Sequence, residues 1–466
     1  MLFKRKTSSI MTEGVIWKQL VSFSIPLLIG NLFQQLYNTV DSIVVGNFVS
    51  TQALAAVGST GPVINTLVGF FMGLSTGASV IISQYYGARD NKNLRLAVHT
   101  TMIMTFILAV VFTFVGIAIV PFMLRFMKTP DDVFAESVEY LRIYFAGVSG
   151  LMVYNIGSGI LRAIGDSRRP LYFLCVSSLI NVVLDLLFVL QFNMGIAGVA
   201  YATIIAQFVS AILVLIVLSN KSEPYGIVWR EMRLSKAILK VIVRVGMPAG
   251  LQQAVTSFSN VFVQSYINVF GSSCMAGWTS YSKIDQFVML PMQSLALAST
   301  TFVGQNLGAH QLDRAKKGMR TSLYIAIGTT AVLAILLNIF ASQLLQLFNQ
   351  EADVLHYGII FVRFMSPFYV LCCWNQIFSG ALRGAGDSTG PMVIMLSSFV
   401  VFRQVYLFIA SRLFDSIYVT ALAYPIGWLL CSLLVYIRYR RGKWEKNYSL
   451  LVDTEKAQQT DEPQNA

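Results

Sequence analysis

A twelve-residue segment that occurs twice in the chain constrains the fold more than any other feature of the sequence. Residues 159–170 return as residues 380–391, at an offset of 221, with seven of the twelve positions identical. Other landmarks repeat at nearly the same offset: Pro26 with Pro248, Asn38 with Asn260, and Gln84 with Gln305. Self-similarity at one long period indicates that a structural unit is present in two copies.

Hydropathy indicates that this duplicated unit lies in lipid. The chain is 55% hydrophobic and 12% charged, whereas a soluble protein carries about a quarter charged residues. Twelve apolar runs reach the roughly 20 residues that a helix needs to cross a bilayer, and they lack the alternation of a membrane β-barrel. The expected spans lie near 19–45, 53–82, 95–119, 134–159, 170–191, 195–219, 238–269, 275–303, 319–343, 354–380, 389–411 and 417–438.

The distribution of Lys and Arg predicts the orientation of these spans. The two tails, the loops on their side of the membrane and the adjoining ends of the spans contain 27 of the 34 basic residues, and the opposite loops contain three. The positive-inside rule therefore predicts a cytoplasmic-membrane protein with both termini in the cytoplasm. The net charge of +12 reflects this asymmetry and some attraction to anionic membrane lipid. No basic cluster with interleaved aromatic residues points to nucleic acid.

The even number of spans in each copy determines how the two copies are related. Because six spans return the chain to its starting side, the copies are parallel repeats related by an axis along the membrane normal. We expect an all-α integral membrane fold with twelve transmembrane helices in two six-helix repeats. The expected parts are an N-terminal bundle, a cytoplasmic linker, a C-terminal bundle and a disordered cytoplasmic tail, at 1–219, 220–237, 238–442 and 443–466.

Sequence signatures of enzymes, nucleotide sites and metal sites are absent. The sequence has no Gly-rich phosphate loop ending in Lys-Ser or Lys-Thr, and its three histidines share no metal-ligand spacing. Its five cysteines are odd in number and lie mostly inside apolar runs, so they form no disulfide framework. We therefore expect a protein that is not an enzyme, has no cofactor or metal centre, and draws its energy from an ion gradient.

Polar residues within the apolar runs carry a family resemblance. They are Pro26, Gln34, Tyr37, Asn38 and Asp41, the segment 84–89, the two Leu-Arg-x-x-Gly-Asp-Ser segments, and Asn181 with Asp185. With them, residues 15–440 resemble the multidrug and toxic compound extrusion (MATE) transporters. The resemblance implies a V-shaped two-bundle antiporter whose cation coupling, to H⁺ or Na⁺, involves Asp41, Asn181, Asp185 and Thr203. Another branch of the family uses acids at places where this chain has Thr256 and Cys372, so the resemblance favours coupling in the N-terminal bundle alone.

The spacing of polar residues in the first span supports a site around Asp41. Gln34, Asn38 and Asp41 are at i, i+4 and i+7, so they share one helix face, with Tyr37 at its edge. A charge at this depth costs at least ~2.5–3.5 kcal/mol and is functional by default. The alternative is a structural carboxylate that pairs across the bundle.

Asn181 and Asp185, one turn apart in the fifth expected span, supply a second polar face. Two carboxylates with an amide could share a proton or bind Na⁺ through their oxygens, and close approach of the carboxylates would favour the shared proton. The alternative role for Asp185 is helix–helix hydrogen bonding.

The second repeat serves as an internal control for these residues. It keeps a polar stripe through Gln253, Thr256 and Asn260, but the place of Asp41 falls near Val263 and that of Asp185 on Tyr406. The shared stripe is thus scaffold or cavity lining, and the acids are particular to the first repeat. Candidates for lining a substrate cavity are Gln34, Tyr37, Asn38, Asn155, Gln253, Thr256, Asn260 and Lys283.

Pro26 precedes Asp41 by about four turns and removes one helix hydrogen bond. It is a candidate hinge that changes the bend of the first helix when Asp41 is protonated, and a static kink is the alternative. Together these features predict an exporter of amphipathic, cationic organic compounds that functions as a monomer. A flippase for lipid-linked precursors is the nearest rival, kept open by Lys283 and Arg403, and a non-transporting receptor is a remote one.

Overall fold

A computed structural model describes residues 10–127, 129–414 and 416–446, and these residues are almost entirely helical. The first repeat contains α1 (Ile16–Phe48), α2 (Thr51–Gly87), α3 (Asn91–Phe126), α4 (Asp131–Ala146), α5 (Val148–Ala163), α6 (Arg168–Leu186), the π-helical η1 (Leu187–Gln191) and α7 (Gly195–Leu218). The connection to the second repeat includes η2 (Trp229–Glu231). Of the predicted tail, 447–466 lies outside the described residues.

The second repeat has the same order of long helices. It contains α8 (Lys236–Asn268), α9 (Ser272–Gly308), α10 (Leu312–Ile339), α11 (Ala341–Gln346), α12 (Ala352–Met365), η3 (Ser366–Phe368), α13 (Tyr369–Gly384), α14 (Thr389–Leu396), the π-helical η4 (Ser397–Phe402), α15 (Arg403–Leu413), α16 (Ile417–Arg440) and α17 (Lys443–Lys446). Each apolar run expected from the sequence lies within one of these helices or a continuous series of them.

The count of spans agrees closely with the twelve expected. Within the described residues, ten helical segments are long and apolar enough to cross a membrane, and α4 with α5 forms an eleventh span bent by 49°. The remaining expected span is α8, whose 33 residues measure roughly 50 Å at 1.5 Å per residue. Its lower hydropathy follows from the polar stripe that the sequence places along it.

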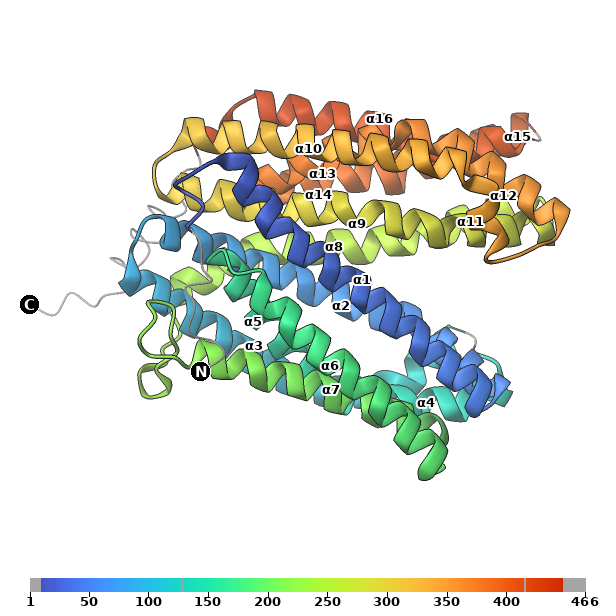
Figure 1. Ribbon diagram of the computed structural model, residues 1–466, viewed down its shortest axis with the longest axis horizontal. Coiled ribbons are helices and arrows are strands. Elements are labelled where there is room, and N and C mark those ends of the chain that lie inside the picture. Colours follow the sequence, from blue (N-terminus) through green and yellow to red (C-terminus); the bar gives the residue numbers. More distant parts are fainter. Residues whose placement is uncertain (1–9, 128, 415, 447–466) are drawn as a thin grey trace, which may run out of the picture.

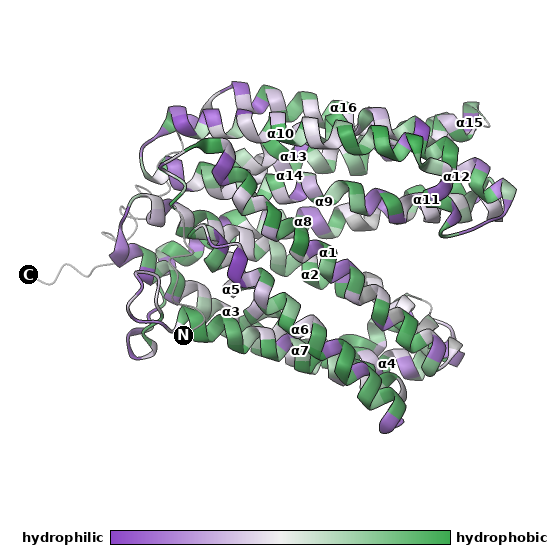
Figure 2. Ribbon diagram, in the orientation of Figure 1, coloured by the Kyte–Doolittle hydropathy of each residue, from purple (hydrophilic) through white to green (hydrophobic). Residues whose placement is uncertain are grey.

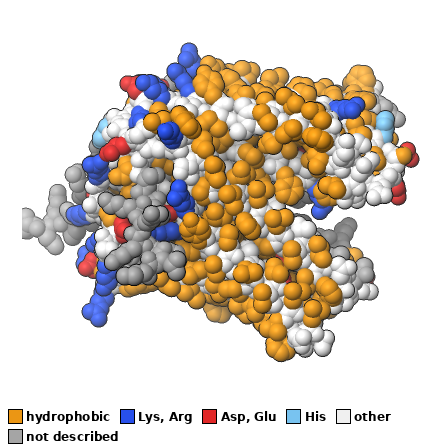
Figure 3. All heavy atoms as spheres, in the orientation of Figure 1, with side chains coloured by type: hydrophobic (Ala, Val, Ile, Leu, Met, Phe, Trp, Pro, Cys, Tyr) orange, Lys and Arg blue, Asp and Glu red, His pale blue; other side chains and the backbone are white. Residues whose placement is uncertain are grey.

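The two repeats form two bundles that meet at one end and separate at the other (Figure 1). Apolar residues cover the helices along most of their length, and polar residues gather at the helix ends (Figure 2). Most Lys and Arg side chains in view lie at the end where the bundles meet, and the surface is hollowed between the bundles at the opposite end (Figure 3). We call these ends the basic end and the open end.

Helices α1 and α8 each begin against the opposite repeat and end within their own. Leu20, Phe23 and Leu27 of α1 pack in one apolar cluster with Ala298 and Phe302 of α9. In the same way Ile238, Ile242 and Val245 of α8 join the core of the first repeat. Farther along, α1 packs on α6 and α8 packs on α14. Pro26 and Pro248 lie where the two helices pass from one bundle to the other.

Glycines allow the bundles to meet at backbone distance along α2 and α8. A Cβ atom on Gly73 would clash with the backbone nitrogen of Gly250, and one on Gly77 would lie 2.6 Å from the Cα atom of Gly246. Nearer the open end, a Cβ atom on Gly58 or Gly61 would have no neighbour within 4 Å. Helix α2 is therefore in contact with the other bundle around Gly73 and Gly77 and separated from it around Gly58 and Gly61.

A reciprocal pair of glutamines joins the repeats at the basic end. Gln84 of α2 donates to the Gly384 carbonyl at 3.0 Å, and Gln305 of α9 donates to the Ala163 carbonyl at 2.7 Å. All four residues occupy equivalent places in the two repeats. The match breaks at the N-terminal segment, where Met11 donates its backbone N–H to Gln305 Oε1 at 2.8 Å and is fully buried.

We expect Gln305→Leu to lower the unfolding temperature more than Gln84→Leu does. Gln305 satisfies a donor and an acceptor from two different segments, and an unsatisfied buried polar group costs about 1–3 kcal/mol. Unfolding of the two purified variants in detergent, followed by tryptophan fluorescence, measures the difference. Equal shifts would show that the contact with Met11 does not contribute to stability.

The duplicated Leu-Arg-x-x-Gly-Asp-Ser segments are the turns that the sequence indicates. Gly165 and Gly386 have positive φ values of 87° and 86°, which a side chain would disfavour. Asp166 then accepts backbone N–H bonds from Arg168 and Arg169 at 3.1 Å, which caps the start of α6. In the second repeat Asp387 accepts the N–H of Gly390 at 3.1 Å and forms a bidentate ion pair with Arg438.

Candidate ion and substrate site

A narrow cavity inside the first bundle brings together most of the residues singled out in the first repeat. It has a volume of about 100 Å³ and lies among α1, α5, α6 and α7. The predicted residues that line it are Pro26, Gln34, Tyr37, Asn155, Asn181 and Thr203. The side chain of Asn38 lies outside the described residues. The polar residues of α1 and Asn181 of α6 therefore line the same cavity.

The two acids of the first repeat meet beside this cavity. The side chains of Asp41 of α1 and Asp185 of α6 interact directly, and Asn181 donates to Asp185 Oδ2 at 3.4 Å. Asp185 is fully buried and Asn181 is 2% exposed. Since two neighbouring carboxylates repel each other when both are ionised, holding one proton between them stabilises the pair.

Buried oxygen atoms that accept no hydrogen bond leave this pair free to bind a proton or a small cation. Asp41 Oδ1, Asp185 Oδ1 and Asn181 Oδ1 are buried and have no hydrogen-bond partner within the described structure. Thr203, the fourth predicted member, is 9% exposed and donates to the Val199 carbonyl at 2.9 Å. Such an oxygen-lined site can exchange a proton or hold a small hard cation. The described residues contain no cluster of three His, Cys, Asp or Glu side chains that could hold a transition metal.

Tyrosines and a second amide complete the site, and the sequence analysis missed them. Tyr140 of α4 interacts electrostatically with both Asp41 and Asp185, and Tyr144 of the same helix interacts with Gln207 of α7. Gln207 also lines the cavity. A signal for Gln207 was present, because Thr203 and Gln207 are one turn apart in an otherwise apolar span. The tyrosines gave no comparable signal, since aromatic residues are common throughout the spans.

The cavity candidates from the second repeat lie elsewhere. Asn260 accepts from Arg403 Nη2 at 2.9 Å, and Thr256 donates to the Gln252 carbonyl of its own helix. Gln253 faces Gly69 across the contact between α2 and α8, and Lys283 is exposed on α9. None of the four lines the cavity of the first bundle. Within the polar stripe of α8, Asn260 contacts another helix through Arg403, and both Gln253 and Asn260 are exposed.

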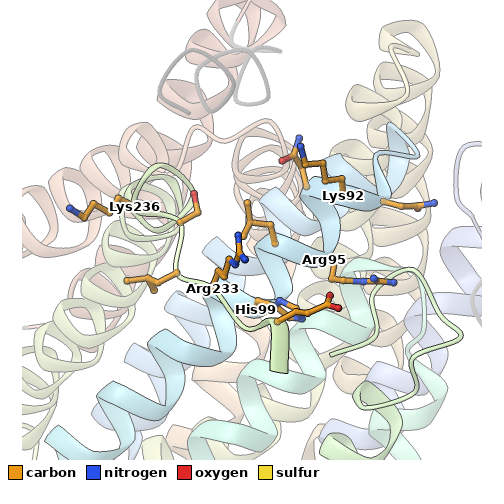
Figure 4. A pocket seen from close by; sticks show the side chains of 11 residues that line it. Lys92, Arg95, His99, Arg233 and Lys236 are labelled. Atoms are coloured by element: carbon orange, nitrogen blue, oxygen red, sulfur yellow. The ribbon is translucent and has the colours of Figure 1, made fainter. Parts of the chain in front are cut away.

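A larger pocket lies at the basic end, away from the acid pair (Figure 4). It measures about 990 Å³ and is lined by the first turns of α3 and α8 with the loop between α7 and α8. His99 accepts the N–H of Val228 at 3.1 Å and Thr100 that of Ser235 at 3.1 Å, which ties this loop to α3. Its basic side chains are Lys92, Arg95, His99, Arg233 and Lys236. We assign the ion site to the smaller cavity because only there do buried acids meet.

Two parallel six-helix bundles with buried acids inside their apolar spans are the architecture of a multi-pass membrane transporter. The MatE family model matches residues 26–187 and 248–409, one match in each repeat. The chain therefore belongs to the MatE family, that of the multidrug and toxic compound extrusion transporters.

Individual relatives agree with this assignment. The chain is 30% identical over 439 residues to the probable multidrug resistance protein YoeA of Bacillus subtilis, covering 92% of this chain and 95% of that one. It matches the outward-facing conformation of a multidrug resistance MATE family transporter with a TM-score of 0.88, 27% identity, and coverage of 95% and 99%. It also matches a transporter from Pyrococcus furiosus, described as having a binding pocket of reverse polarity, with a TM-score of 0.87, 27% identity, and coverage of 96% and 99%.

Proposed function

We propose that this protein is an antiporter that exports amphipathic, cationic organic compounds in exchange for H⁺ or Na⁺. The observation that carries the proposal is the interacting pair of buried acids, Asp41 and Asp185, beside the cavity of the first bundle. An acid pair attracts an organic cation when it is ionised and loses that attraction when it holds a proton or Na⁺. Binding of the coupling ion and of the exported cation therefore oppose each other, which is the requirement for exchange.

The dimensions of the cavity require a conformational change during transport. A volume of about 100 Å³ admits ions and water, whereas sites for drug-sized compounds measure roughly 300–1,000 Å³. One wall is formed by α1 through Pro26, Gly30, Gln34 and Tyr37. Movement of this helix would enlarge the cavity for substrate and close it again when the coupling ion binds.

Pro26→Ala should lower the initial rate of efflux several-fold. Pro26 lies where α1 passes from the second repeat to the first and also lines the cavity, so the missing hydrogen bond lets the two parts of the helix move separately. Pro248→Ala is the matched control, because α8 is held against α2 by the close contacts of Gly246 and Gly250. Full transport by Pro26→Ala would establish a static kink.

The distribution of charge supports an orientation for the transporter. The basic residues gathered at the end where the bundles meet support a cytoplasmic position for that end under the positive-inside rule. The opening between the bundles would then face outward, and both termini would lie in the cytoplasm of a cell whose cytoplasmic membrane holds the protein. A single chain supplies both bundles, so a monomer suffices for function.

A flippase for lipid-linked precursors is the second candidate function. Arg162 lines the cavity, and Arg403, only 3% exposed, adds a buried cation in the second bundle. Both would favour an anionic substrate group.

Efflux of a permanently charged fluorescent dye from proteoliposomes tests the proposed function and identifies the coupling ion. The wild-type protein should move the dye under an imposed proton or sodium gradient, and removing that gradient should stop the movement. Failure of both gradients to drive efflux would favour the flippase, which is then tested with a labelled lipid-linked precursor.

A further inference from the structure

A carboxyl group in the second bundle has a hydrogen-bonded site of its own. Asp285 of α9 accepts from the hydroxyl of Tyr369 at 2.6 Å and from that of Tyr281 at 3.2 Å. The two hydroxyl groups are 3.1 Å apart. Tyr281 is 2% exposed and Tyr369 fully buried, whereas Asp285 is half-buried. Two fixed donors therefore hold the carboxylate of a residue that is still partly exposed.

A charged carboxylate at the position of Asp285, far inside a membrane-spanning helix, costs free energy, which indicates a function. Asp285 is thirteen residues from Ser272, where α9 begins, which is roughly 20 Å along the helix. A charged side chain at the centre of a bilayer costs about 2.5–3.5 kcal/mol or more. Its place in the first repeat is occupied by Ile64, so the common fold does not require an acid at this position.

Packed aromatic rings around the tyrosines restrict what Asp285 can bind. Trp278 lies 5.2 Å from Tyr281 and 4.9 Å from Phe361 between ring centroids, and Tyr369 lies 6.1 Å from Trp428. Rings at these separations are in contact, so an organic amine has no room among them. The only oxygens that these contacts bring together belong to one carboxylate and two phenols, which is fewer than the six or so that a hard cation takes.

One buried cation lies on the far side of this aromatic cluster. The guanidinium of Arg403 lies 4.8 Å from the ring centroid of Tyr424 and donates to Ser259 at 3.0 Å and to Asn260 at 2.9 Å. Tyr424 interacts electrostatically with both Arg403 and Asp285. The other titratable groups facing Asp285 are Tyr281, Tyr369 and Cys372, and exposed Lys283 lies two residues away on α9.

We propose that Asp285, held by Tyr281 and Tyr369, is a second proton-exchanging acid, located in the bundle that lacks Asp41 and Asp185. A proton taken from water adds to a carboxylate oxygen, forms one O–H bond and removes one negative charge. The attraction of that charge for an organic cation between the bundles is then lost, while Arg403 keeps its positive charge. The inference rests on the proposed exporter and gives each bundle one site at which protonation opposes substrate binding.

Infrared difference spectroscopy between low and high pH tests this proposal in reconstituted wild-type protein. A buried carboxylic acid absorbs through its C=O stretch only while it is protonated, so each exchanging acid contributes one band. The Asp285→Asn spectrum should lack a band that Asp41→Asn and the control Asp387→Asn retain. In Tyr369→Phe, which keeps the carboxyl group but loses the 2.6 Å bond, the same band should shift in frequency. Addition of tetraphenylphosphonium, which has no proton of its own, should diminish this band in the wild type.

The outcomes separate this inference from the proposed function. If Asp285→Asn and Tyr369→Phe both give the wild-type spectrum, the cluster is structural and the inference is wrong, even when Asp41→Asn loses a band and dye efflux is intact. If the band is present but unaffected by tetraphenylphosphonium, Asp285 titrates without linkage to substrate, and the proposed coupling is wrong. Failure of the proposed function would instead appear as absence of gradient-driven efflux in the wild type.

Discussion

Asp41→Asn should abolish gradient-driven efflux and reduce the rate to that of protein-free liposomes. Asparagine keeps the shape of the side chain but exchanges no proton and carries no charge, so the pair with Asp185 becomes a fixed amide–carboxyl contact. The buried and unpartnered Oδ1 atoms of Asp41 and Asp185 show that the pair has unused capacity for an ion. Initial rates of dye efflux under the driving gradient, at equal amounts of reconstituted protein, measure the effect.

Asp90→Asn is the matched control for this loss. Asp90 caps α3 by accepting from the backbone and the side chain of Asn93, so the same substitution there removes a carboxylate outside the cavity. It should retain most of the efflux, with a stability cost of about 1 kcal/mol or less from the altered cap. Unchanged efflux in Asp41→Asn would mean that Asp41 only joins helices, and the coupling role would then fall to Asp185 or to the second bundle.

Gly73→Ala should destabilise the packing of α2 against α8 far more than the small size of one added methyl group suggests. The added methyl group would clash with the backbone of Ala249 and Gly250 on α8, and backbone atoms cannot rotate away as a side chain can. Overpacking of this kind costs about 1–3 kcal/mol. The expected result is a lower unfolding temperature in detergent together with slower efflux, because α2 and α8 no longer meet at this point.

Gly58→Ala, in the same helix, makes the same chemical change in open space. No atom lies within 4 Å of the added methyl group, and alanine is favoured over glycine in a helix by about 1 kcal/mol. This variant should be as stable as the wild type or more so. If the two variants were equally stable, the close contact between α2 and α8 would not hold the bundles together, and other contacts such as those of Gln84 and Gln305 would have to do so.

Features contained within a single segment could be predicted from the sequence. The duplication, the membrane spans and the turns at Gly165 and Gly386 follow from hydropathy, from periodicity and from the backbone freedom of glycine. The acid site was also accessible, because Gln34 and Asp41 share a helix face and Asn181 and Asp185 are one turn apart. The signals of the turns and of the acid site are local, since they depend on residues within about two helical turns, whereas the duplication appears when two distant segments are compared.

Contacts between distant segments were decided only by the tertiary structure. The sequence showed Gln84 and Gln305 as equivalent residues, yet each bonds across to the opposite repeat, and Met11 binds only one of them. No residue near Asp285 in the sequence indicates its partner, and the fold brings Tyr369 of α13 to it. Arg403 likewise finds Asn260 of α8.

The sequence by itself thus determined that the helices lie in lipid, that the chain consists of two similar repeats, and on which helix faces the polar residues gather. Only the tertiary structure decided which of those faces meet, because helix packing depends on how side chains from many helices fit together at once. A polar residue in a span signals that a partner exists, since lipid supplies none. The identity of that partner depends on which helices cross at that depth, and no local pattern encodes the crossing.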